Sequence, residues 1–120
     1  MMTIVLYLAL AMVTIHLAGS VLSFQGRTYP RRLGIAIALY EAAFYVTIVA
    51  LRLGLPTILF ALAYVYLVIH VVGGALYIRG SLHQVYAGMG VGHGVRWLLY
   101  YGVYELAEMI YLTVLLITIA

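Results

Sequence analysis

Four long apolar segments constrain this chain more than any other feature. They cover approximately residues 4–23, 33–51, 56–78 and 95–119 of the 120-residue sequence. A helix needs about 20 apolar residues to cross the hydrocarbon core of a bilayer, and each segment is about that long. Only 8% of the residues are charged, against roughly a quarter in soluble domains. We therefore expect an all-α, integral membrane four-helix bundle that forms a single domain.

The connections between these segments carry most of the positive charge. Five of the six basic residues lie in or beside the first and third connections: Arg27, Arg31, Arg32, Arg79 and Arg96. The positive-inside rule then predicts that residues 24–32 and 79–94 are cytoplasmic and that both termini lie outside the cell. Short connections also favour antiparallel packing of sequential helices. A chain with so little sequence outside the bilayer is not expected to bind nucleic acid.

Two pairs of segments share a sequence pattern. The pattern I-H-x-x-G-x-x-L occurs at residues 15–22 and again at 69–76. The second and fourth segments each carry an arginine, and nine positions later a glutamate preceded by tyrosine, at Glu41 and Glu105. These matches predict a duplicated two-helix hairpin, related by a pseudo-twofold axis along the membrane normal.

Each apolar segment contains one ionisable residue at a similar depth: His16, Glu41, His70 and Glu105. Small and polar residues recur at helical spacing around each histidine and predict the inward face of its helix. In the first segment these are Ala9, Met12, His16, Gly19, Ser20 and Ser23; in the third they are Ala63, Tyr66, His70, Gly73, Gly74 and Tyr77. Ionisable groups in hydrocarbon are costly and usually functional, so this layer is the candidate site.

The first interpretation of the layer is a haem b whose axial ligands are His16 and His70, in a small subunit of an electron-transfer complex. Glu41 and Glu105 would fix the tautomer of each ligand. Arg96 and His93, at the start of the fourth segment, would be available to propionates or a quinone head group. A variant replaces haem by one non-haem metal ion, or a pair of ions, bound by two His and two Glu.

Two other interpretations use the same residues. Glu41, Glu105 and Glu108 could carry protons, which predicts a proton or ion pathway. Glu108 has no counterpart in the second segment, where Phe44 occupies the matching place, and this asymmetry counts against a symmetric cofactor site. Alternatively, His16–Glu41 and His70–Glu105 pairs only join helices in a structural accessory subunit. In each case we expect partner subunits or a homo-oligomer rather than an isolated enzyme.

Two motifs resemble the haem b membrane-anchor subunits of succinate dehydrogenase. "HGVRWLLYY", from His93, is similar to their H-x-x-G-x-R type segment, and "IHVVGGALYIRG" is similar to their haem-ligand helix. The resemblance implies a respiratory setting, with a bound haem b and electron transfer to quinone. Those anchors have three spans rather than four, and their Ser-His-Arg motif before the first span is missing here.

Overall fold

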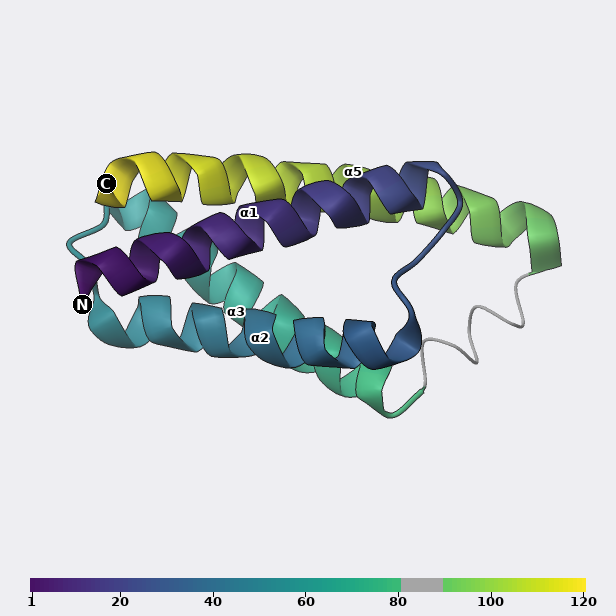
Figure 1. The fold of residues 1–120 in the computed structure, drawn as a ribbon, viewed down its shortest axis with the longest axis horizontal. Coiled ribbons are helices and arrows are strands. Elements are labelled where there is room, and N and C mark those ends of the chain that lie inside the picture. The colour runs from purple at the N-terminus through teal and green to yellow at the C-terminus, as the bar shows by residue number, and fades with distance from the viewer. Residues whose placement is uncertain (81–89) are drawn as a thin grey trace.

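The computed structural model consists of four long helices, as the sequence predicts (Figure 1). They are α1 (Met2–Phe24), α2 (Arg31–Leu51), α3 (Thr57–Ile78) and α5 (Gly90–Ile119). The structure describes residues 1–80 and 90–120, and side chains throughout these ranges except at 90–95. All four helices are long and apolar enough to cross a bilayer, so the chain is an integral membrane protein.

Proline and glycine set the helix boundaries. Pro30 and Pro56 are the N-caps of α2 and α3, where the ring lacks only an N–H that the helix does not need. Helix α2 ends at Leu51; its C-cap, Arg52, adopts a left-handed conformation with φ 46°, and Gly54 follows with φ 66°. This pair reverses the chain within a few residues, because glycine accepts a positive φ without strain.

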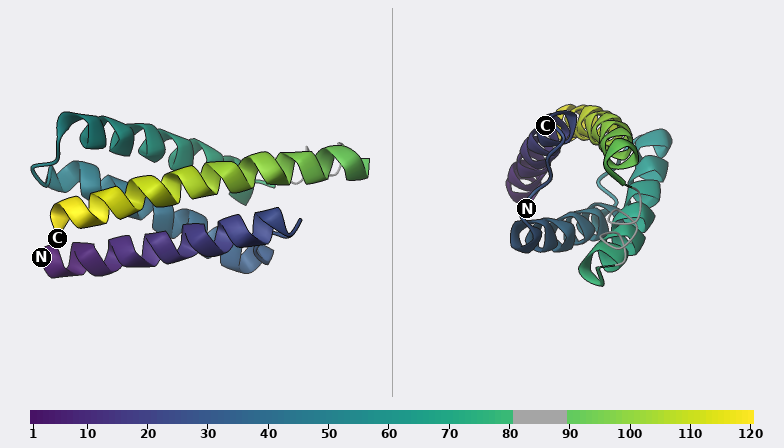
Figure 2. Two further views of the ribbon diagram at one scale, coloured as in Figure 1. Left: turned by 90° about the horizontal axis from the view of Figure 1, so that it is seen from above. Right: turned by 90° about the vertical axis from the view of Figure 1, so that its right-hand side faces the viewer.

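The helices form two closely packed pairs, α1 with α5 and α2 with α3 (Figure 2). In the first pair, the Ser20 hydroxyl donates to the Gly102 carbonyl at 3.1 Å. A Cβ atom on Gly102 would lie 3.0 Å from the Phe24 ring, so the missing side chain permits this approach. In the second pair, Gly74 lies against Ala38, where an added Cβ would make only an ordinary contact at 3.7 Å.

The α2–α3 pair joins sequential helices, as expected, but α1 packs most closely against α5 rather than against α2. Helix α1 contacts α2 only weakly, and the two diverge toward the connection between them (Figure 1). The small residues at Gly102 and Ser20 favour the α1–α5 contact instead. The duplicated hairpin therefore stays a prediction, because the tight pairs are not the two hairpins that the repeat would generate.

The apolar core fills the half of the bundle that contains both chain termini. Its buried members come from all four helices: Val5, Ala9, Met12, Phe44, Tyr45, Ile48, Leu59, Ala63, Tyr111, Leu112, Leu115 and Ile119. The predicted inward face of α1 is confirmed at all six positions. On α3 only Ala63 and His70 of the predicted face are buried; Gly73, Gly74 and Tyr77 border a cavity, and Tyr66 is partly buried against the apolar core.

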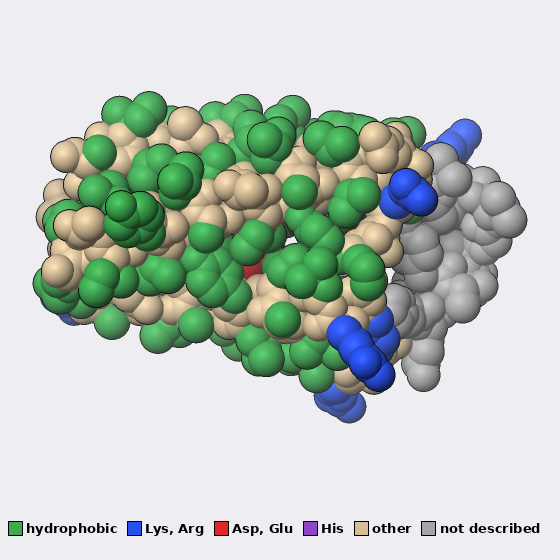
Figure 3. All heavy atoms as spheres, viewed as in Figure 1, with side chains coloured by type: hydrophobic (Ala, Val, Ile, Leu, Met, Phe, Trp, Pro, Cys, Tyr) green, Lys and Arg blue, Asp and Glu red, His purple; other side chains and the backbone are tan. Residues whose placement is uncertain are grey.

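The outer surface fits a lipid environment. Large apolar side chains such as Ile4, Val68 and Ile117 are exposed along the bundle, and Figure 3 shows them covering its length. Most basic side chains gather at the end opposite the termini (Figure 3). The bundle measures 45 Å along its longest axis, which suffices to cross a bilayer of about 30 Å hydrocarbon thickness.

Candidate metal centre

All three acidic residues of the sequence and two of its four histidines meet inside the bundle. His16 comes from α1, Glu41 from α2, His70 from α3, and Glu105 and Glu108 from α5. All five are at most 9% exposed. We call these five residues the His/Glu cluster.

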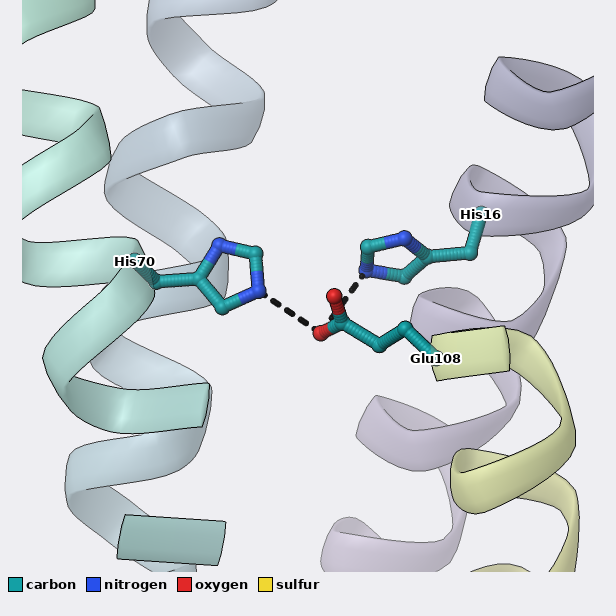
Figure 4. Close-up of side chains that lie close together, drawn as sticks. All are labelled: His16, His70 and Glu108. Carbon is teal, nitrogen blue, oxygen red and sulfur yellow. Dashed lines mark hydrogen bonds and ion pairs between the residues drawn. The ribbon is translucent and has the colours of Figure 1, made fainter. Parts of the chain in front are cut away.

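Glu108 lies at the centre of the cluster. Its Oε1 atom is 2.6 Å from His70 Nε2 and 3.3 Å from His16 Nε2, so its carboxylate stands between the two imidazoles (Figure 4). The Tyr45 hydroxyl donates to the same oxygen at 2.7 Å. Glu108 is fully buried, and it therefore acts as the bridge between the two helix pairs.

Glu105 and Glu41 complete the cluster on the other sides of the rings. His16 Nδ1 is 2.5 Å from Glu105 Oε2, and His16 Nε2 is 3.5 Å from Glu41 Oε1. His70 Nδ1 is 3.1 Å from the second oxygen of Glu41. The two imidazole centroids are 5.9 Å apart, so the predicted meeting of His16 and His70 is observed.

The pairing of histidines with glutamates differs from the sequence-based expectation. The predicted His16–Glu41 contact is present but long, whereas Glu105 pairs with His16 rather than with His70. Glu108, predicted only as an extension of a proton path, is the most central carboxylate. The cause is the packing of α5 against α1, which turns Glu105 toward His16 and carries Glu108 between the rings.

Of the tyrosines around the cluster, sequence reasoning placed Tyr66 on an inward face but missed Tyr45. Tyr45 stacks on the His70 ring, with centroids 5.2 Å apart and planes 12° apart, while its hydroxyl holds Glu108. A signal was available, because a tyrosine stands four residues from each of four cluster members. The pairs are Glu41–Tyr45, Tyr66–His70, Tyr101–Glu105 and Tyr104–Glu108. Residues at this spacing lie on the same face of a helix.

Three buried polar atoms in this region lack a hydrogen-bond partner among the described residues: His16 Nε2, Glu108 Oε2 and Tyr104 Oη. Buried polar groups are nearly always satisfied, so each exception calls for an explanation. His16, His70 and Glu108 each offer a ligand atom, and these three atoms lie within 4.8 Å of one another. An ion bound between them would satisfy the first two atoms.

A cavity borders the cluster on one side. Its volume is about 380 Å³, and it meets the cluster at Glu41, His70 and Glu105, on the side of the arginine-rich end. Tyr29, from the connection between α1 and α2, borders this cavity, and its hydroxyl donates to the Ile15 carbonyl at 2.6 Å. Burial, followed by the negative charges of Glu105 and Glu41, raises the pKa of the Tyr29 phenol, which stays a hydrogen-bond donor.

Arg96 does not belong to the cluster. The Arg96 side chain is exposed, nine residues before Glu105 along α5, which is roughly 13 Å at the rise of a helix. The side chain of His93 lies outside the described residues. Their predicted roles toward propionates or a quinone head group stay predictions.

The donor set is that of a first-row transition metal site. Imidazole nitrogens combined with carboxylates suit iron, manganese or zinc, and two His with one carboxylate form the usual ligand set of non-haem iron. Three carboxylates in a buried layer also need positive charge nearby. A divalent or trivalent ion would supply it, with His16, His70 and Glu108 as candidate ligands from α1, α3 and α5 and Glu41 of α2 close to both imidazoles.

Comparisons with known protein families, with curated proteins and with solved structures find no match to this chain.

Proposed function

We propose that this protein is a membrane metalloprotein that binds one transition metal ion, with iron as the preferred ion, inside the bundle. His16, His70 and Glu108 are the direct ligands in this proposal, while Glu41 and Glu105 orient the imidazoles or complete the coordination. When bound, the ion supplies Lewis-acid or one-electron redox chemistry. The polypeptide supplies the ligands, holds them in the bilayer interior and limits the access of water.

The unpaired atoms of the cluster are the observation that carries this proposal. Among the described residues, Glu108 Oε2 has no hydrogen-bond partner, and His16 Nε2 forms no hydrogen bond although it lies 3.3 Å from Glu108 Oε1 and 3.5 Å from Glu41 Oε1; both side chains are fully buried. Leaving such groups unpaired in an apolar interior is costly. Metal coordination removes this cost, and it also explains why a chain with only three acidic residues places all of them at one point.

A small electron-transfer subunit remains the functional setting that we propose for this metal centre. Non-haem iron fits the present arrangement better than haem b, because the Glu108 carboxylate fills the space between the two imidazoles. A porphyrin bound axially by both rings requires Glu108 to leave that space. Haem b between His16 and His70 therefore stays a prediction, which an absorption spectrum of the purified protein tests directly.

Proton exchange is a second candidate function. The contacts from Glu105 through His16 and Glu108 to His70 are close enough for a proton relay. The relay lies within one layer, however, and the apolar core closes the bundle on the side of the termini. These features support local proton exchange more than conduction across the bilayer. Proton flux into liposomes by metal-free protein tests this function separately.

The test of the proposed function is the metal content of the protein, isolated from membranes in mild detergent without chelators. Elemental analysis is expected to find about one transition metal ion per chain in the wild type. The His70→Gln and Glu108→Gln variants are expected to lose at least about nine-tenths of it, since each removes a direct ligand. Both substitutions keep a polar side chain of similar size.

Ser20→Ala is the matched control. It removes a buried polar group one turn beyond His16, in the same α1–α5 contact, without touching a cluster atom. Its metal content should equal that of the wild type, and circular dichroism should show that every variant keeps its helices. A folded wild-type protein without bound metal, even after incubation with ferrous, manganous or zinc salts, would contradict the proposal.

A further inference from the structure

The cavity beside the His/Glu cluster has the volume of a small-molecule site. Its volume of about 380 Å³ falls within the range of ligand pockets, roughly 300 to 1,000 Å³. Residues from all four helices and from the first connection border it. The contacts within the His/Glu cluster do not explain why the bundle contains this cavity.

The floor of the cavity is polar. It is formed by Glu41, His70 and Glu105, whose side chains are 11%, 9% and 6% exposed, whereas Glu108 behind them is fully buried. The Tyr104 side chain also borders the cavity, and its buried hydroxyl, which interacts with the Glu108 carboxylate, forms no well-aligned hydrogen bond with the described residues. The floor therefore offers carboxylate oxygens as acceptors and a phenolic hydroxyl as donor.

The walls of the cavity are apolar and flat. They include the aromatic rings of Tyr29, Tyr77, Trp97, Tyr101 and Tyr104. On α3 the wall has no side chain at Gly73, where an added Cβ would meet nothing within 4 Å. Aromatic walls favour a planar ring, because rings pack well in offset or edge-to-face geometry.

An opening between the two helix pairs connects this region with the outer surface. Figure 3 shows a hollow in the apolar face, and an acidic side chain is visible at its floor. The helices on either side, α1 and α2, are the ones that contact each other weakly. A molecule dissolved in the bilayer has a lateral route to the cluster between these helices.

We propose that the cavity binds a lipophilic phenol, an apolar ring that carries a hydroxyl group. The ring lies against the aromatic walls, and the hydroxyl donates to the carboxylate of Glu41 or Glu105 while it accepts from Tyr104. A carboxylic acid would be repelled by the floor, and an alkyl chain would leave the polar atoms of the floor unpaired. This inference deepens the proposed function by naming the molecule that reaches the metal, but the hydrogen bonds do not require the metal.

The sequence contains a single tryptophan, Trp97, which borders the cavity and reports on its occupancy. We would titrate the protein in nanodiscs with 4-hexylphenol and with 4-hexylanisole, which has the same ring and chain but no donor. Wild-type fluorescence should change saturably with the phenol, at least about tenfold more tightly than with the anisole, because only the phenol donates to a carboxylate. Equal binding of both probes would overturn the inference, as would no saturable change.

A comparison of two variants, Gly73→Leu and Ala75→Leu, tests whether the probe binds in the cavity. Leucine at Gly73 fills the cavity, whereas leucine at Ala75 adds the same side chain to an exposed position outside it. Only Gly73→Leu should abolish phenol binding, and both variants should keep the wild-type metal content. Phenol binding that survives Gly73→Leu would overturn the assigned location. Because metal content is measured separately, a failure here is distinguishable from a failure of the metal proposal.

Discussion

Among single residues, Glu108 contributes most to the chemistry of the site. One oxygen of its carboxylate contacts both imidazoles and the Tyr45 hydroxyl, while the other has no partner among the described residues. A carboxylate held on one side and free on the other is suited to binding an ion. Tyr45 is the residue that holds it, since its ring stacks on His70 and its hydroxyl reaches Glu108.

Replacement of Tyr45 by phenylalanine should therefore weaken metal binding without removing a ligand. The variant keeps the stacked ring but loses the donor to Glu108, and loss of such a supporting hydrogen bond typically costs about 10- to 100-fold in metal affinity. Competition with a metal-sensitive dye measures the change. Tyr40→Phe is the control, because its hydroxyl donates to the Leu8 carbonyl rather than to the cluster, and its affinity should stay at the wild-type value. Equal losses in both variants would argue against a specific role for Tyr45.

The sequence predicts most members of the site but not its centre. His16, Glu41, His70 and Glu105 are found because ionisable residues in apolar segments are conspicuous and because helical rise gives their depth. The central role of Glu108 is not predicted, because the apparent repeat has no matching glutamate in the second segment. The contacts of Glu108 depend on which face of each helix packs against which neighbour. Residue spacing alone does not determine these faces when apolar residues surround each helix.

At the scale of helices, glycine determines how closely the site is assembled. A Cβ on Gly19 of α1 would lie 3.0 Å from Glu105 Oε2, the oxygen that pairs with His16. A Cβ on Gly73 of α3 would meet nothing. Replacement by alanine therefore tests close packing at Gly19, whereas at Gly73 it tests helix propensity alone.

Gly19→Ala should destabilise the bundle, and Gly73→Ala should stabilise it slightly. Overpacking typically costs about 1 to 3 kcal/mol, while alanine gains up to about 1 kcal/mol over glycine in a helix. Because Glu105 is held by His16, it cannot move away without losing that contact. Unfolding in detergent, followed by circular dichroism, compares the two variants. A Gly19→Ala protein as stable as Gly73→Ala would show that α1 and α5 separate at no cost.

At the scale of the whole molecule, the two ends of the bundle differ. Five of the six basic residues lie at or near the end with the 24–32 connection, while Arg52 lies at the end with the termini. The cavity opens toward the basic end, and the apolar core closes the other. The positive-inside rule predicts that the basic end, and the cavity near it, lie on the cytoplasmic side.

This orientation is testable because the sequence contains no cysteine. Gln25→Cys places a thiol at the exposed end of α1, and Ala120→Cys places one at the C-terminus. In intact cells a membrane-impermeant maleimide should label Ala120→Cys but not Gln25→Cys, and both should react once the cells are opened. The reverse pattern of labelling would place the cavity on the outer side of the membrane.

X-ray absorption at the edge of the bound metal shows which atoms bind it. A metal held by His16, His70 and Glu108 should give a first shell of nitrogen and oxygen at about 2.0 to 2.2 Å, with the outer-shell scattering of two imidazole rings. His70→Gln protein that retains metal after reloading should show the scattering of one ring. A sulfur shell, a porphyrin signature or a first shell without imidazole would contradict a metal centre built from His16, His70 and Glu108.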